Sequence, residues 1–276
     1  MDLEGLKRRI GIDLGRKYPA EEGIAWAAGN DVRVVDIEID AAPNALATFL
    51  GGRGDALRAA CAAGGIKLGL HTLSAVNVAE LSPFVSDAVD QYLNAYIAAA
   101  RRLGAGWVVV HAGYHFTGDY KARRQAALER LKRAVGHAEE QGVTLLLENL
   151  NREPADAEVH YLAFNLEEWA FYLDAIRSPA LRSAFTVNHA HLVPEGIAGH
   201  LAALDVARLV EVRLADNRGD KEQHLRPGEG TIDFVALFRA LEGAGFAGHY
   251  MNAFGTRDDM LAGRAYYLQA LAAAHR

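Results

Sequence analysis

Four apolar runs of the sequence each end on a side chain that could bind a metal ion or move a proton. The four end points follow one another at intervals of roughly 40 residues. In chain order, they are His71, His111, Glu148 and His191. Strands that recur in this way, each carrying one polar side chain to a common rim, are typical of the active site of a barrel of eight strands and eight helices. The pattern therefore predicts an enzyme.

Short runs rich in β-branched residues predict the eight strands that would position these side chains. The predicted strands are 9–13, 32–39, 66–71, 107–111, 143–148, 184–188, 209–216 and 249–253. Amphipathic stretches between them, such as 87–103 and 121–141, have the 3.6-residue period of helices and end at glycines. We therefore expect an α/β fold, a (β/α)₈ TIM barrel, as a single domain over residues 1–276.

Composition and charge limit the partners of the protein. The net charge is −6 and no basic block is present, so we expect no nucleic-acid partner, and the composition argues against a role in DNA repair. No apolar stretch reaches the ~18 residues of a membrane span, and the first residues lack the apolar centre of a signal peptide. We expect a cytoplasmic protein with a small-molecule substrate. The single cysteine, Cys61, can form no internal disulfide, and we expect it to be buried.

Several segments resemble the xylose isomerase-like TIM barrel superfamily, which includes sugar isomerases, epimerases, inosose dehydratases and the family 2 AP endonucleases. The most specific is the H-x-x-P-G-x-G-x-[IV]-D pattern from His224 to Asp233. The others are His71, VVVHAG at 108–113, LLLEN at 145–149, NHAH at 188–191 and EVRLADN at 211–217. The resemblance implies that the protein isomerises or epimerises a small polyol or sugar, in most members with the help of a divalent metal.

The chain departs from this family at the central metal. The four ligands of sugar-epimerase members, two Glu, an Asp and a His, fall here on Glu148, Asn188, Arg213 and Asn252. Asparagine brings no charge, and a guanidinium has no lone pair and would repel a divalent ion. We therefore expect no metal at the central site. Arg213 and the two asparagines are expected to bind a carboxylate, phosphate or carbonyl of the substrate instead.

Two flanking metal sites of the family have counterparts in the sequence. The resemblance places the first on His71, His111 and Glu148, and the second on His191, Glu222 and His224. Such nitrogen and oxygen ligands suit Zn or Mn, but they also suit hydrogen bonding to a substrate. We favour the second use, so that a cofactor is not expected and a divalent metal is the minority alternative.

Glu148 is the first candidate for acid or base catalysis. A carboxylate at the end of an apolar strand is partly desolvated, which predicts a raised pKa, whereas neutralisation by Arg213 or Arg152 is the alternative. His191 is a candidate second proton carrier, since its ordinary pKa is about 6.5, and Arg213 would stabilise an oxyanion. The predicted substrate-binding residues are His71, His111, Asn188, Asp216, His224, Arg226 and Asn252.

Other residues near the predicted rim leave two interpretations open. Asp13 and Glu38, in the first two strands, would either point into the pocket or form structural ion pairs. Residues 114–116, Tyr-His-Phe, would either enclose a ligand or pack within a loop.

The predicted function is that of a sugar isomerase or epimerase that transfers a proton on a polyhydroxylated or keto compound. A lyase or dehydratase and a non-catalytic sugar-binding protein remain as alternatives. The resemblance also allows a homo-oligomer, because relatives often form dimers or tetramers.

Overall fold

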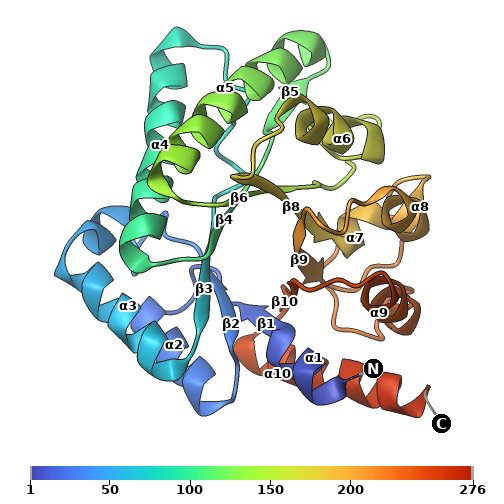
Figure 1. Ribbon diagram of the computed structural model, residues 1–276. Coiled ribbons are helices and arrows are strands. Elements are labelled where there is room, and N and C mark those ends of the chain that lie inside the picture. Colours follow the sequence, from blue (N-terminus) through green and yellow to red (C-terminus); the bar gives the residue numbers. More distant parts are fainter. Residues whose placement is uncertain (1, 275–276) are drawn as a thin grey trace.

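Eight parallel strands form a closed barrel in the computed structural model of the protein, which describes residues 2–274 (Figure 1). The strands are β1 (Ile10–Asp13), β2 (Val34–Ile37), β3 (Lys67–His71), β4 (Trp107–Val110), β6 (Leu145–Glu148), β8 (Leu181–Thr186), β9 (Leu209–Leu214) and β10 (His249–Asn252). Each strand pairs with the next one around the barrel, and β1 closes the ring by pairing with β10. The predicted (β/α)₈ barrel is confirmed.

Helices surround the barrel on its outer side (Figure 1). They are α1 (Leu3–Arg9), α2 (Ala20–Gly29), the 3₁₀ helix η1 (Leu46–Leu50), α3 (Gly52–Gly64), α4 (Pro83–Leu103), α5 (Tyr120–Gln141), α6 (Leu166–Ala175), α7 (Val187–Ala190), α8 (Gly196–Ala203), α9 (Phe234–Gly243) and α10 (Arg257–Ala273). The two helices predicted over 87–103 and 121–141 correspond to α4 and α5. Both end, as expected, at a glycine in the left-handed conformation.

Two segments near the rim differ from the prediction. The strand predicted over 184–188 ends at Thr186, and one turn of helix, α7, follows it directly. Residues 114–116 form a short strand, β5, that pairs in antiparallel fashion with β7 (Val159–Tyr161). Three-residue strands leave almost no periodicity in a sequence, so this two-stranded sheet was not predicted.

The barrel interior combines a small apolar cluster with buried polar groups. Its apolar members are Val34, Trp107, Val109, Leu146, Ala184 and Met251. Gly69 on β3 lies beside two of the interior side chains, where a Cβ would collide with the Trp107 indole and the Asp36 carboxylate. Its lack of a side chain leaves room for the Trp107 Nε1 to donate a hydrogen bond of 3.0 Å to Asp36. Outside the barrel wall, Cys61 is buried in the core between strands and helices, as predicted.

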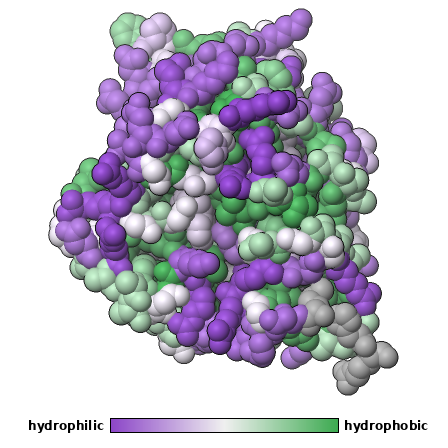
Figure 2. Space-filling model, in the orientation of Figure 1, coloured by the Kyte–Doolittle hydropathy of each residue, from purple (hydrophilic) through white to green (hydrophobic). Residues whose placement is uncertain are grey.

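Among residues 2–274, no helix is both long and apolar enough to cross a bilayer. The face in Figure 2 carries hydrophilic residues across its upper and lower parts, with hydrophobic residues between them.

Candidate active site

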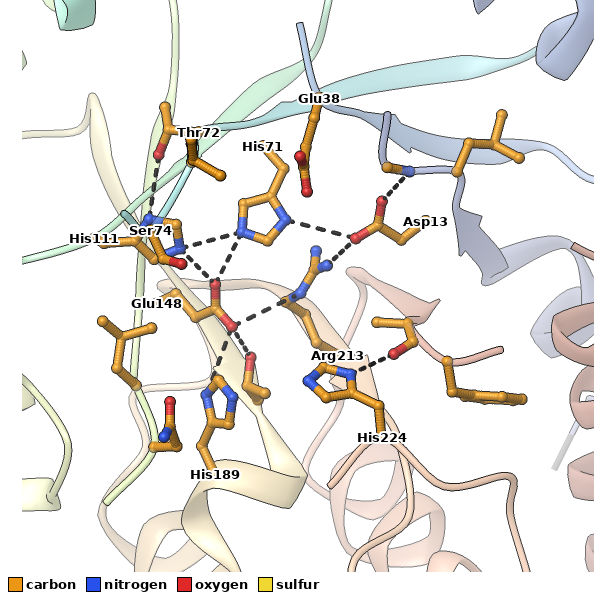
Figure 3. A pocket seen from close by; sticks show the side chains of 18 of the residues that line it. Asp13, Glu38, His71, Thr72, Ser74, His111, Glu148, His189, Arg213 and His224 are labelled. Carbon is orange, nitrogen blue, oxygen red and sulfur yellow. Dashed lines mark hydrogen bonds and ion pairs between the residues drawn. The ribbon is translucent and has the colours of Figure 1, made fainter. Parts of the chain in front are cut away.

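A cavity of about 420 Å³ lies at the carboxyl ends of the barrel strands, where enzymes of this fold place their active sites. β1, β3, β6 and β9 each carry a polar side chain to it (Figure 3). Of the residues predicted from the sequence as catalytic or substrate-binding, five line the cavity: His71, His111, Glu148, Arg213 and His224. The fold therefore brings together side chains that are far apart in the sequence, such as His71 and His224, whose numbers differ by 153.

His71, His111 and Glu148 form a compact triangle. The two Nε2 atoms are 3.1 Å apart, and each lies near Oε2 of Glu148, at 3.2 Å from His71 and 3.1 Å from His111. The side chains of His111 and Glu148 are almost completely buried, whereas that of His71 is 14% exposed. Three such atoms can share a proton or hold a metal ion.

His71 is the protonated member of this triangle. Burial and the nearby Arg213 charge oppose its protonation, but contacts with Asp13 and Glu148 outweigh them and raise the pKa of His71 to about 10. Burial lowers the pKa of His111, despite its contact with Glu148. At neutral pH the cavity therefore presents a cationic His71 beside a neutral His111.

The raised pKa predicted for Glu148 is wrong. Burial does raise the pKa of this carboxyl, but His111, His71 and Arg213 together lower it well below its ordinary value. The Thr186 hydroxyl also donates a hydrogen bond of 2.5 Å to Oε1. Glu148 is therefore an ionised carboxylate whose oxygens are held by neighbouring groups.

Arg213 reaches into the barrel and is surrounded by carboxylates. Its Nη1 lies 3.0 Å from Asp36 and 2.6 Å from Glu211, its Nη2 contacts Asp13, and its Nε lies 3.8 Å from Glu148. Burial opposes the charge, but these four acids raise the pKa of Arg213 well above its ordinary value. The prediction that Arg213 binds a substrate anion is not supported, because both Nη atoms already have carboxylate partners.

His191 does not reach the cavity, although it was predicted to be catalytic. Its ring contacts the Thr231 hydroxyl at 2.9 Å. His189 lines the cavity instead, with its side chain 8% exposed. The physical reason is the helical turn α7 after Thr186. Side chains follow a 3.6-residue period in a helix and alternate between two faces in a strand, so residues 189 and 191 point in other directions than a continued strand would give them.

Four predicted substrate-binding residues also lie outside the cavity lining. Asn188 donates to Glu222 at 2.9 Å, and Asn252 donates to the Met260 carbonyl. Arg226 is exposed and forms an ion pair with Asp259. The fourth, Asp216, accepts hydrogen bonds from the backbone N–H groups of the loop that follows it, at Asn217, Gly228, Gly230 and Ile232. Its carboxylate organises that loop.

The central metal site of the resembling family does not fit these side chains. A cationic guanidinium stands at one of the four positions, and uncharged amides stand at two, with Nδ2 of Asn188 donating to Glu222 and Nδ2 of Asn252 donating to the Met260 carbonyl. Glu148 is the one ligand of the four that faces the cavity as a carboxylate.

Glu38 and Asp13 both line the cavity, which answers the question that the sequence left open. Asp13 also forms an ion pair with Arg213, so it has both predicted roles. Burial and the neighbouring Asp13 raise the pKa of Glu38, whose nearest cation is Arg16 at 3.9 Å. Sequence analysis missed the cavity residues His189 and Tyr161, because they lie in α7 and β7, two short elements that it did not predict.

Comparisons with known proteins agree with this architecture. The family model described as "Xylose isomerase-like TIM barrel" matches residues 24–272. No curated protein matches the sequence. Among solved structures, a D-tagatose 3-epimerase-like protein has a TM-score of 0.82 at 20% identity, over 97% of this chain and 100% of that one. An L-ribulose 3-epimerase has a TM-score of 0.77 at 17% identity, over 97% and 96% of the two chains. The E. coli 3-keto-D-glucoside 4-epimerase has a TM-score of 0.76 at 17% identity, over 96% of this chain and 99% of that one.

Proposed function

The chain belongs to the xylose isomerase-like TIM barrel family, and from this premise we propose that it is an isomerase- or epimerase-like enzyme. Its substrate is a small polyhydroxylated or keto compound, and its reaction is the transfer of a proton. The sugar epimerases among the similar structures support this substrate class. The central divalent metal takes no part, because Arg213 stands at its position.

The observation that carries this proposal is the pairing of an acid and a base in one cavity. His71 is protonated at neutral pH, and Glu38 points into the same cavity (Figure 3). Of the carboxylates that line the cavity among residues 2–274, Glu38 alone has a raised pKa, while Asp13, Glu148 and Glu222 have lowered ones. A carboxylate with a higher pKa is the stronger base, so Glu38 is the best proton acceptor of the four.

The proposed reaction starts at the carbon next to a carbonyl group. Glu38 takes the proton from this carbon while His71 gives its proton to the carbonyl oxygen, which produces an enediol. Glu38 then protonates the former carbonyl carbon. His71 recovers a proton from the hydroxyl on the carbon that Glu38 first deprotonated. Both groups return to their starting states, and the carbonyl has moved by one carbon. Glu148, the acid/base candidate from the sequence, here keeps His71 charged and in position.

Arg213 does not provide a binding site for the phosphate of a phosphorylated substrate. Both Nη atoms of Arg213 are engaged by carboxylates, so the guanidinium at the floor of the cavity is not free to bind a phosphate. The walls offer hydroxyl and imidazole groups, including Ser74, Tyr161 and His224, that can hydrogen-bond the hydroxyls of a polyol.

Proton transfer to and from carbon can be measured before the product is known. We would first select ketoses and keto compounds that bind, by their effect on the melting temperature, and then follow deuterium incorporation from D₂O by mass spectrometry. Wild-type protein should label a bound compound, and Glu38→Gln and His71→Gln should lower the rate by at least about 100-fold. His191→Gln, a change outside the cavity, should leave the rate unchanged.

Two results would contradict the proposal. Release of water from the compound would identify a lyase or dehydratase. A compound that binds tightly but exchanges no hydrogen would identify a non-catalytic sugar-binding protein.

A further inference from the structure

Two tyrosines of α4 and an aspartate after β2 form a cluster that the proposed mechanism does not use. Tyr92 and Tyr96 are one helical turn apart, so they share a face of the helix. The Tyr92 hydroxyl donates to Oδ1 of Asp40 at 2.7 Å, and the Tyr96 hydroxyl donates to Oδ2 at 2.6 Å. Burial raises the pKa of both tyrosines, so both keep the protons that they donate. We call these three residues the clamp.

The clamp also holds the backbone on two sides. The Ile39 N–H donates to the Tyr96 hydroxyl at 3.2 Å. The Leu73 N–H donates to the Tyr92 hydroxyl at 2.8 Å. The Tyr96 hydroxyl also lies 3.2 Å from the carbonyl oxygen of His71. Ile39 belongs to the loop after β2 and Leu73 to the loop after β3, so the clamp connects these two loops to each other and to α4.

The two loops follow directly on the proposed base and acid. The pairing between β2 and β3 ends at Ile37 and Leu70. The next residues along the chain are Glu38 and His71. Beyond the last pair, the pairing of these two strands no longer sets the distance between their side chains. The clamp is attached one residue after Glu38 and two residues after His71, so it holds the backbone where the pairing stops.

We infer that the clamp positions Glu38 and His71 for proton transfer. The inference rests on the proposed function, which assigns removal of the carbon-bound proton to Glu38 and protonation of the carbonyl oxygen to His71. One substrate has to meet both groups at once, so their separation decides whether both transfers occur. A misplacement of about 1 Å can lower a rate by about 100-fold, even when its cause lies far from the reacting atoms. Asp40, Tyr92 and Tyr96 are positioning residues, because none of them lines the cavity.

Replacement of each tyrosine by phenylalanine tests the clamp without changing a charge or removing a ring. In the deuterium-incorporation assay, Tyr92→Phe and Tyr96→Phe should each lower kcat by about 10- to 100-fold. KM should change little, because the side chains that line the cavity are all retained. NMR should also show faster hydrogen exchange at the Leu73 amide in Tyr92→Phe and at the Ile39 amide in Tyr96→Phe, since each amide loses its acceptor.

Tyr250→Phe is the matched control. Tyr250 is buried and its hydroxyl donates to Glu242 at 2.7 Å, but it does not line the cavity. The change should lower the melting temperature about as much as the clamp variants do and should leave kcat unchanged. Tyr92 is partly exposed, so Tyr92→Phe carries the test if the change at the buried Tyr96 impairs folding.

The outcomes separate this inference from the proposed function. A fall of kcat in Tyr250→Phe equal to that in the clamp variants would reduce the effect to lost stability and overturn the inference. Wild-type kcat in both Tyr92→Phe and Tyr96→Phe would also overturn it, while the proposed function would stand. Wild-type protein that labels no bound compound would overturn the proposed function, and the inference with it.

Discussion

Arg213 reaches from β9 across the barrel and places its Nε 3.8 Å from Oε1 of Glu148 on β6. Its two Nη atoms meanwhile contact carboxylates on β1, β2 and β9. One fixed cation thus connects the cavity floor to the charged interior of the barrel. A bound metal ion can exchange with solvent. The guanidinium cannot, because it is part of the Arg213 side chain.

Replacement of Arg213 by methionine should strongly destabilise the fold. The change leaves Asp13 and Glu211, whose pKa values Arg213 helps to lower, buried without their cation, and removal of one partner from a buried ion pair typically costs about 3–5 kcal/mol. Urea denaturation should show a loss of this size. Arg226→Ala breaks an exposed ion pair with Asp259 and should change the free energy of unfolding by less than about 1 kcal/mol. Equal effects of the two changes would contradict the central role of Arg213.

Glu148→Gln should lower kcat/KM by a factor of about 100 or more while the fold stays intact. A neutral amide cannot hold the charge on His71, so the pKa of His71 should fall toward its ordinary value, as followed by NMR titration of the ring. Glu229→Gln, an exposed change outside the cavity, is the matched control. Unchanged turnover in Glu148→Gln would remove this residue from the mechanism.

The contribution of His71 to stability should disappear at high pH. Its pKa is about 10 in the folded protein and about 6.5 in the unfolded chain, so the folded state holds its proton more tightly. The resulting stabilisation is complete below about pH 6.5 and is lost as the pH rises toward about 10. Denaturant unfolding of wild type and His71→Gln, with chelator present, should therefore show a difference at pH ~6 that shrinks by pH ~10. A difference that is constant with pH would show that His71 is neutral in the fold.

Gly69→Ala tests the packing inside the barrel. The added methyl group would collide with the Trp107 indole and the Asp36 carboxylate, so we expect a loss of about 1–3 kcal/mol from overpacking. Gly136→Ala, on α5 where nothing lies within 4 Å of the new Cβ, should instead stabilise the protein by up to about 1 kcal/mol. Thermal melts of the two variants should shift in opposite directions.

The sequence predicts the barrel and the positions where its strands deliver side chains to the cavity. Continuous apolar runs mark the buried parallel strands, and the polar residue that ends each run must lie at the rim. His71, His111 and Glu148 were found in this way. Such reasoning needs only local periodicity, which the short strands of this barrel retain.

Other features depend on contacts that no local pattern contains. Whether His189 or His191 faces inward is decided by a single helical turn after Thr186, where an extended strand fits the sequence equally well. The pKa of Glu148 is set by His71, His111 and Arg213, which lie 77, 37 and 65 residues away by sequence number, so burial alone gave the wrong direction. The role of Asp216 likewise depends on the path of the loop that it binds.

The ion pairs of Arg213 also constrain when the barrel can be completed during synthesis. Asp13 and Asp36 meet their cation across 200 and 177 residues of chain. On the ribosome, both acids emerge long before β9 and lack the Arg213 guanidinium, so we expect the N-terminal half to stay open to proteases until residue 213 has left the exit tunnel. Limited proteolysis of chains stalled before and after this point would show the transition.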